Sequence, residues 1–384
     1  MSIFIHKDSR VVVQGVTGKE GAFWAKHMKD MGTQVVFGVT PGKEGQDVDG
    51  IPVYHSVRRG MKDHPADVAM LFVPPKFTKD AVFEALDAGI RKICTIADGI
   101  PLHEAIQIRR AALSCGAMVV GGNTSGIISV GEAMLGTIPY WIDRVYKKGH
   151  VGVMTRSGSL TNEVTAEIVK GGFGVTTLIG VGGDPVPGTR FAELLPLYEA
   201  DPDTHAVVII GELGGTMEEE VAEAMEAKTF TKPLVAFMGG RTAPEGKRMG
   251  HAGAIVTGGR GTVKGKTEAL VKAGGKVAQR PSQVGELLKE FLGSPHGAPL
   301  RGGAPFSHPS QCFDEKPFPS YGAPAAVFRW PNEHYDRAGP SPQPEVSYEI
   351  SRVDGVAGPC VQPVPDRKAR RGRRTGTDRL DRRT

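Results

Sequence analysis

The chain has 384 residues, of which 40% are hydrophobic and 23% are charged, as is typical of a soluble protein with more than one folded domain. We expect neither a membrane span nor secretion, because no apolar run could cross a bilayer and residues 1–10 lack the apolar core of a signal sequence. Much of the net charge of +5 lies at the C-terminal end, so the folded part gives no reason to expect nucleic acid binding. The four cysteines lack metal-ligand spacing and suit a reducing cytoplasm.

A doubly wound α/β domain is predicted over residues 1–125. A strand of the buried type at 10–14 leads into G-V-T-G-K-E-G at 15–21, and an amphipathic helix follows at 22–31. A glycine turn between a strand and a helix is a common phosphate site, because the helix N-terminus presents free N–H groups. NAD is the default ligand of such a turn. However, the next strand, 34–39, ends without the acidic residue that would bind a ribose.

The turn T-P-G-K, which ends in Lys43, follows that second strand directly. A cation here fits a ligand with an additional phosphate, such as the 3′-phosphate of coenzyme A, although a solvated lysine in a turn would have the same spacing. A strand at 66–75, a helix at 78–88 and a strand with its turn at 92–101 continue the α/β alternation.

A second α/β domain is predicted over residues 148–292, with its first strand at 151–155. Small polar residues then begin a helix, where free N–H groups could hold an anion, and ordinary helix capping would explain them equally. They are Ser157, Gly158 and Ser159. Glu212 ends a later buried strand, before two glycines, at the edge where doubly wound sheets bind ligands.

The glycine-rich stretch 240–261 contains one histidine, His251. Dense glycines let the backbone approach a ligand closely, and a neutral imidazole can act as a nucleophile. Lys247 and Arg248 just before it would suit a phosphoryl group carried on the ring. A histidine packed in a turn is the alternative. Residues 293–384 are rich in Pro, Gly, Ser and Arg, and we predict a disordered tail there, with a nucleic-acid-binding or partner-binding tail as the alternative.

The run G-K-R-M-G-H-A-G-A at 246–254 resembles the phosphohistidine loop of the α-subunit of succinyl-CoA synthetase. Residues 179–188 match another loop of that family, G-I-G-G-D-P-x-P-G, and the resemblance ends near Leu292. It implies a Rossmann-like CoA-binding domain followed by a flavodoxin-like, doubly wound domain. It also implies that His251 accepts a phosphoryl group from ATP or GTP and passes it to a carboxylate, while Glu212 orients the imidazole.

Three segments of that family contact coenzyme A: Q-G-x-T-G-x-x-G, T-P-G-K and I-T-E-G-I-P. The third reads I-A-D-G-I-P here, so that Asp98 keeps the carboxylate on a side chain one methylene shorter. The residues that the resemblance assigns to coenzyme A are Thr17, Gly18, Lys19, Glu20, Lys43, Ile96, Ala97 and Asp98.

Two segments depart from the family pattern near the implied acid substrate. The loop G-P-N-C-P-G of the family reads G-G-N-T-S-G at 121–126, which retains Asn123. Where the family places a tyrosine at the acid, this chain has Asn162, and ATP-citrate lyase has a similar asparagine. An amide both donates and accepts hydrogen bonds, which suits a larger or more polar acid than succinate. The implied substrate and phosphate residues are Asn123, Ser157, Gly158, Ser159 and Asn162.

We therefore predict the α-subunit of an acid–CoA ligase that forms succinyl-CoA through a phosphohistidine and an acyl phosphate. The resemblance implies a β-subunit with an ATP-grasp domain, which would bind ATP or GTP with Mg²⁺ in an αβ or α₂β₂ assembly. No metal ligands are predicted in this chain. The alternatives are the same chemistry on citrate, malate or a sulfonated acid, a non-catalytic CoA-binding regulatory subunit and, more distantly, an NAD dehydrogenase.

Overall fold

The computed structural model describes residues 3–241, 250–254 and 261–294. His251 is therefore described, whereas Lys247 and Arg248 are outside the described residues. The predicted tail, 293–384, is also outside them except for its first two residues. Within the described ranges, every helix is too short or too polar to cross a bilayer.

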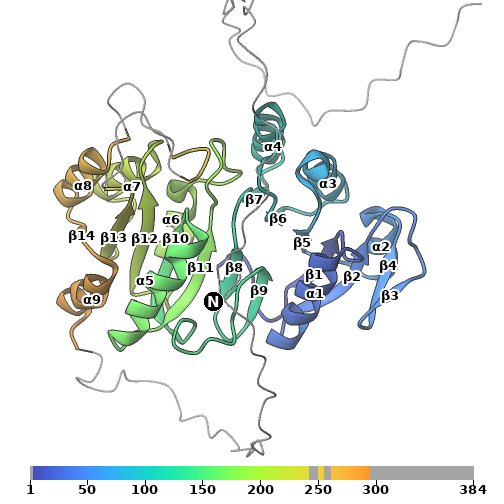
Figure 1. Ribbon diagram of the computed structural model, residues 1–384, viewed down its shortest axis with the longest axis horizontal. Helices are drawn as coiled ribbons and strands as arrows, with labels where there is room; N and C mark the ends of the chain where they lie inside the picture. The colour runs from blue at the N-terminus through green and yellow to red at the C-terminus, as the bar shows by residue number, and fades with distance from the viewer. Residues whose placement is uncertain (1–2, 242–249, 255–260, 295–384) are drawn as a thin grey trace, which may run out of the picture. The chain divides into compact units, whose positions relative to one another are not determined.

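The first sheet has seven strands in the order β3-β4-β2-β1-β5-β6-β7 (Figure 1). All neighbours pair in parallel except β3 and β4, as expected for a doubly wound fold. The strands are β1 (Arg10–Gln14), β2 (Gln34–Val39), β3 (Asp47–Val48), β4 (Ile51–Tyr54), β5 (Val68–Leu71), β6 (Lys92–Thr95) and β7 (Met118–Val120). The helices are α1 (Lys19–Met31), α2 (Val57–Asp63), α3 (Pro75–Asp87) and α4 (Leu102–Ser114).

The turn between β1 and α1 explains why this part of the sequence is rich in glycine. Gly15 has a φ of +82°, a conformation that favours glycine because it has no Cβ. A Cβ on Gly21 would lie 2.2 Å from the carbonyl oxygen of Gly15, so only glycine lets the first turn of α1 pack directly on the loop. The N-terminus of α1 is thereby fixed at the carboxyl end of β1.

The second sheet also has seven strands, in the order β14-β13-β12-β10-β11-β8-β9 (Figure 1). They are β8 (Gly126–Ser129), β9 (Ala133–Gly136), β10 (Lys148–Thr155), β11 (Val175–Gly180), β12 (Ala206–Glu212), β13 (Leu234–Gly239) and β14 (Lys276–Ala278). Its helices are α5 (Gly158–Lys170), α6 (Phe191–Ala200), α7 (Met217–Glu226), α8 (Val263–Lys272) and α9 (Val284–Leu292), with a 3₁₀ turn at Pro281–Gln283. Strand β8, which lies between the two predicted domains in the sequence, pairs antiparallel with β11 and so extends this sheet.

Hydrogen bonds join loops at the carboxyl ends of the two sheets, which face the same side in Figure 1. The Gly183 N–H donates to the Asn123 carbonyl at 3.1 Å, and the Gly188 N–H donates to Gly121 at 2.7 Å. Arg109 on α4 forms an ion pair with Glu193 on α6, with Nη1 2.8 Å from Oε2.

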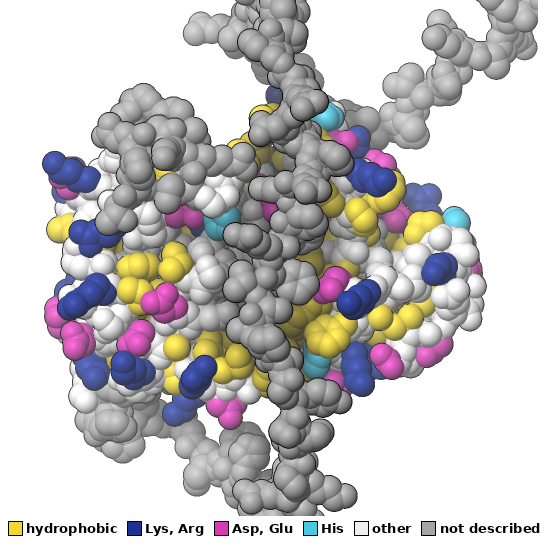
Figure 2. Space-filling model, in the orientation of Figure 1, with side chains coloured by type: hydrophobic (Ala, Val, Ile, Leu, Met, Phe, Trp, Pro, Cys, Tyr) yellow, Lys and Arg dark blue, Asp and Glu magenta, His cyan; other side chains and the backbone are white. Residues whose placement is uncertain are grey.

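The α/β prediction with two doubly wound parts is confirmed. Figure 2 shows basic and acidic side chains interspersed over the visible face.

Candidate active site

His251 and Glu212 form the predicted pair. His251 Nδ1 lies 2.8 Å from Glu212 Oε2, and Glu212 is the last residue of β12. Because a carboxylate only accepts hydrogen bonds, Nδ1 carries the proton and Nε2 presents its lone pair. The hydrogen bond that His251 donates to Glu212 raises the pKa of His251 above its ordinary value, against the opposing effect of burial. The carboxylate thus favours a positive charge on the ring, the state that develops when Nε2 acquires a phosphoryl group.

Glu212 is held by a buried group of charges that was not predicted. Arg156 Nη2 lies 3.1 Å from Glu212 Oε1, and Lys266 Nζ donates to the backbone carbonyls of Glu212 and Gly214 at 2.9 and 2.7 Å. Lys266 and Arg156 both pair with Glu218, which is fully buried. Two cations and two carboxylates are therefore paired in a buried region, where an unpaired charge would be costly.

Of these residues, Arg156 could have been singled out from the sequence, whereas Lys266 could not. Arg156 directly precedes the predicted anion-binding serines, so its position could have been noticed. Lys266 has an exposed fraction of 0% although lysine is among the residues that are least often buried. A lysine in an amphipathic helix is normally read as solvent-exposed, and only the tertiary structure shows that α8 points it inward.

A cavity of about 280 Å³ lies beside the His251 ring. Its lining combines His251 with the start of α5: Ser157, Ser159, Leu160, Glu212, Leu213, Gly239, Gly240, Gly250, His251 and Ala254. The Ser157 hydroxyl caps the helix by accepting from the Leu160 N–H at 3.4 Å. Gly158 and Ser159 are exposed in the first turn, where backbone N–H groups lack partners within the helix and suit an anion.

Gly183 and Asp184 connect this cavity to the first domain. A Cβ on Gly183 would lie 2.2 Å from His251 Cγ, so the imidazole packs directly on the glycine. The next side chain, Asp184, is 5% exposed, and its pKa is raised to about 6, mainly by burial and further by Asp98. The Asn123 N–H donates to the Ala97 carbonyl at 2.8 Å, which brings the 96–98 segment to the same junction.

Asn162 hydrogen-bonds another side chain and does not line the cavity. The Tyr146 hydroxyl donates to Asn162 Oδ1 at 2.5 Å, and Asn162 is not among the residues that line the cavity. Thr124, at the other departure from the family pattern, donates its hydroxyl to the Gly180 carbonyl at 2.7 Å. The role of Asn162 at the acid stays a prediction, and its neighbour Tyr146 could not be predicted from the sequence.

The residues predicted to contact coenzyme A follow the carboxyl ends of β1, β2 and β6. The Thr17 hydroxyl donates to Thr40 Oγ1 at 3.1 Å, Gly18 immediately precedes α1, and Lys19 and Glu20 are exposed in its first turn. Lys43 is exposed in the turn after β2, and Ile96, Ala97 and Asp98 follow β6. These positions share one edge of the sheet, whereas their contacts with the ligand remain predictions.

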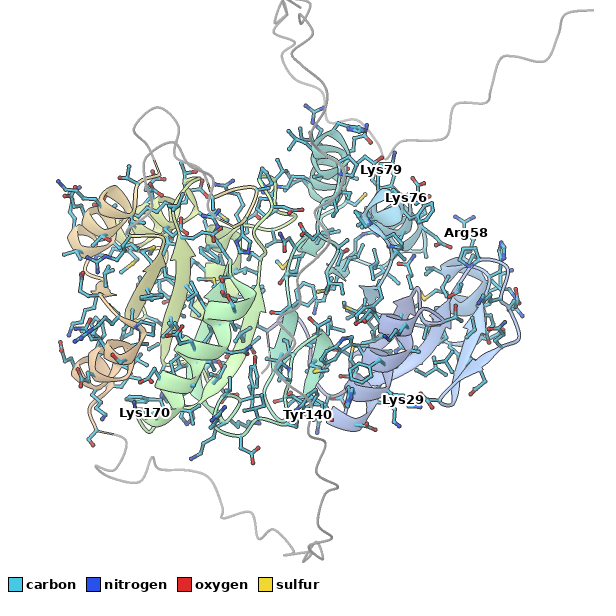
Figure 3. The ribbon with its side chains drawn as sticks, viewed as in Figure 1. Lys29, Arg58, Lys76, Lys79, Tyr140 and Lys170 are labelled. Atoms are coloured by element: carbon cyan, nitrogen blue, oxygen red, sulfur yellow. The ribbon has the colours of Figure 1, made fainter. Side chains whose placement is uncertain are left out.

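Further cations lie close to this edge. Figure 3 shows Lys76 and Lys79 projecting from α3 and Arg58 projecting from α2. Lys76 is in the first turn of α3, directly after the Pro-Pro turn that ends β5. The position of a cation after a strand end was the signal that could have drawn attention to Lys76.

Comparison with known proteins matches residues 6–99 to the CoA binding domain family and residues 154–275 to the CoA-ligase family. The chain is 47% identical over 294 residues to the succinate–CoA ligase [ADP-forming] subunit alpha of Aquifex aeolicus, covering 76% of this chain and 95% of that protein. The chain belongs to the succinate–CoA ligase α-subunit family. The predicted family and the predicted enzyme class, an acid–CoA ligase that forms ADP or GDP, are therefore confirmed, and the relative is named as ADP-forming.

Another member of this family is more similar still. The ADP-forming sulfoacetate-CoA ligase subunit SauD of Bilophila wadsworthia is 97% identical over 293 residues, which are 76% of this α-subunit and 100% of that protein. Among solved structures, the ATP citrate lyase of Methanothrix soehngenii in complex with citrate and coenzyme A is similar, with a TM-score of 0.70 and 26% identity. That match covers 75% of this α-subunit, which spans 50% of the citrate lyase chain.

Proposed function

We propose that this α-subunit, with a partner subunit, joins sulfoacetate to coenzyme A at the expense of ATP through a phosphohistidine at His251. The observation that carries the chemistry is the hydrogen bond between His251 and the buried Glu212, beside a cavity at the N-terminus of α5. A non-catalytic CoA-binding subunit would have no need to keep a buried carboxylate on an imidazole, since burying a charge is costly.

The acid is chosen from the comparisons. The relative with 47% identity is named a succinate–CoA ligase subunit, whereas the relative with 97% identity is named a sulfoacetate-CoA ligase subunit. The similarity to SauD thus favours the sulfonated acid over succinate, our main expectation. Asn162 Oδ1 accepts from the Tyr146 hydroxyl, which orients the amide N–H groups of Asn162 as the donors for a strongly acidic group with three acceptor oxygens.

The chemistry has three steps. His251 Nε2 takes the terminal phosphoryl group of the nucleotide, and Glu212 stabilises the positive ring while N–H groups of α5 bind the phosphoryl oxygens. The phosphoryl group then passes to the carboxylate of the acid to give an acyl phosphate, and the coenzyme A sulfur displaces phosphate. The described residues contain no metal-ligating cluster of three or more His, Cys, Asp or Glu side chains, so we assign the nucleotide and Mg²⁺ to the partner subunit.

The phosphohistidine is tested by incubating the complex of both subunits with γ-labelled ATP and Mg²⁺. Wild type should acquire acid-labile, base-stable label, and His251→Ala should acquire none. His103→Ala, an exposed histidine on α4, is the matched control and should be labelled like wild type. Absence of label on the wild-type α-subunit with both ATP and GTP would refute the ligase mechanism.

The acid is tested on the labelled complex. Sulfoacetate with coenzyme A should discharge the label at least about tenfold faster than succinate with coenzyme A. Asn162→Tyr should shift this preference toward succinate. Equal discharge by the two acids, with no effect of Asn162→Tyr, would contradict both the proposed acid and the proposed role of this side chain.

A further inference from the structure

The last step of the proposed function, on which this inference rests, needs a base. A thiol has an ordinary pKa near 8.5, so coenzyme A is mostly protonated at neutral pH, whereas the thiolate is the nucleophile. The base must lie where the acyl phosphate formed from phospho-His251 meets the segment 96–98, which is predicted to contact coenzyme A. This requirement points to the junction between the loops that follow β6, β7 and β11.

The loop after β11 occupies that junction. On one side, the His251 ring packs on Gly183, and the Gly253 N–H donates to the Gly183 carbonyl at 3.1 Å. On the other side, the Gly183 N–H donates to the Asn123 carbonyl, and Asn123 in turn donates to Ala97 in the predicted coenzyme A segment. Asp184 follows Gly183 directly and is therefore adjacent to both the nucleophile and the coenzyme A segment.

The surroundings of Asp184 favour a basic carboxylate. Its side chain is 5% exposed, hydrogen-bonds Asn123, and packs so closely on Gly122 that a Cβ there would lie 3.0 Å from Oδ2. The titratable groups that face it are Asp98, which raises the pKa of Asp184, and His251, which lowers it. Burial has the largest effect and brings the pKa to about 6. Such a carboxylate is ionised at neutral pH and more basic than an exposed one.

The other carboxylates of the junction are already engaged or open to solvent. Glu212 holds His251 through Oε2 and faces Arg156 through Oε1. Glu218 is buried and pairs with both Arg156 and Lys266. Asp98 is exposed. Among residues 3–241, 250–254 and 261–294, no lysine or arginine forms an ion pair with Asp184, and His251 is the basic group that faces it.

We propose that Asp184 is the general base that accepts the thiol proton of coenzyme A during thioester formation. The S–H bond breaks as the proton moves to a carboxylate oxygen of Asp184. The sulfur forms a bond to the carbonyl carbon of the acyl phosphate, and the bond from that carbon to the phosphate oxygen breaks. Orthophosphate leaves with the electron pair, and the proton on Asp184 passes to solvent before the next turnover.

The test compares Asp184→Asn with wild type in the complex with its partner subunit. Asparagine keeps the size and an acceptor for Asn123 but takes up no proton at neutral pH. Three quantities are measured by rapid quench: phosphohistidine from labelled ATP, acyl hydroxamate when hydroxylamine replaces coenzyme A, and thioester with coenzyme A. We expect the first two to stay within about twofold of wild type and thioester formation to fall by about 10²-fold. The low-pH limb of thioester formation, near pH 6 in wild type, should disappear.

Two further variants make the result specific. Asp201→Asn, a buried aspartate of the same domain that accepts from Thr204, should leave all three quantities near wild type. An unchanged thioester rate in Asp184→Asn would overturn the proposal, as would a parallel loss of all three quantities, which indicates a structural role. A defect confined to thioester formation in Asp98→Asn, with Asp184→Asn normal, would also overturn it. Absence of label in wild type would refute the proposed function itself and is visible before any variant is compared.

Discussion

Replacing Asp184 by asparagine should stabilise the protein at neutral pH. The pKa of Asp184 is raised from an ordinary value of 3.8 to about 6, mainly by burial. The folded state therefore holds the proton more tightly than the unfolded state does. Below about pH 4 the carboxyl is neutral in both states, and its contribution to folding is fully present. As the pH rises through 6, that contribution is lost, because a charge then sits in a buried site.

The size of the effect follows from the shift. A difference of about two pKa units at about 1.4 kcal/mol each corresponds to a loss of about 3 kcal/mol above pH 7. Asparagine resembles the neutral acid at every pH. Asp184→Asn should therefore unfold with a free energy up to about 3 kcal/mol higher than wild type at pH 7.5, and with nearly the same value at pH 4.

Denaturant unfolding of the full chain at several pH values measures this difference, with Asp201→Asn as the control for removing another buried carboxylate. The advantage of Asp184→Asn should grow between pH 4 and pH 6.5 and then level off. A constant difference across this range, or a less stable variant at pH 7.5, would refute the reasoning. A residue whose removal stabilises the fold but slows one chemical step is retained for function rather than for packing.

Three further predictions concern the setting of His251. Glu212→Gln should lower the pKa of His251, because the hydrogen bond to the Glu212 carboxylate raises that pKa. The low-pH limb of phosphorylation should then move to lower pH, while the maximal rate falls about 10–100-fold. A low-pH limb that does not move would contradict this prediction. Gly183→Ala should slow labelling on the order of 10²-fold, because its Cβ would lie 2.2 Å from His251 Cγ, and near-normal labelling would show that the ring is positioned otherwise. Lys266→Met should destabilise the fold by about 3–5 kcal/mol, because it removes one of the two cations that pair with the fully buried Glu218. Adding Glu218→Gln should recover part of this loss in denaturant melts, and additive losses would argue against the ion pair.

Much of the fold could be predicted because its signals are local. The strand at 10–14 contains a continuous apolar run at 11–13, and the strand at 34–39 has the same bounds in the structure as in the prediction. Buried parallel strands read as unbroken hydrophobic segments, and the glycine turn marks where the first one ends. Strands β8 and β9 were not predicted, because the pairing of β8 with β11 and of β9 with β8 is not encoded in a local pattern.

By itself the sequence predicted the nucleophile, its carboxylate partner and the anion-binding helix start, since each lies in a short segment of glycines and capping residues with a recognisable order. The structure places His251 Nδ1 and Glu212 Oε2 2.8 Å apart. The group that holds Glu212 was decided only by the tertiary structure. Arg156 lies in the loop after β10, Glu218 on α7 and Lys266 on α8, and the two positive charges are tolerated because Glu218 and Glu212 neutralise them in the same buried space. Such compensation depends on distance in the fold, which residue order does not specify.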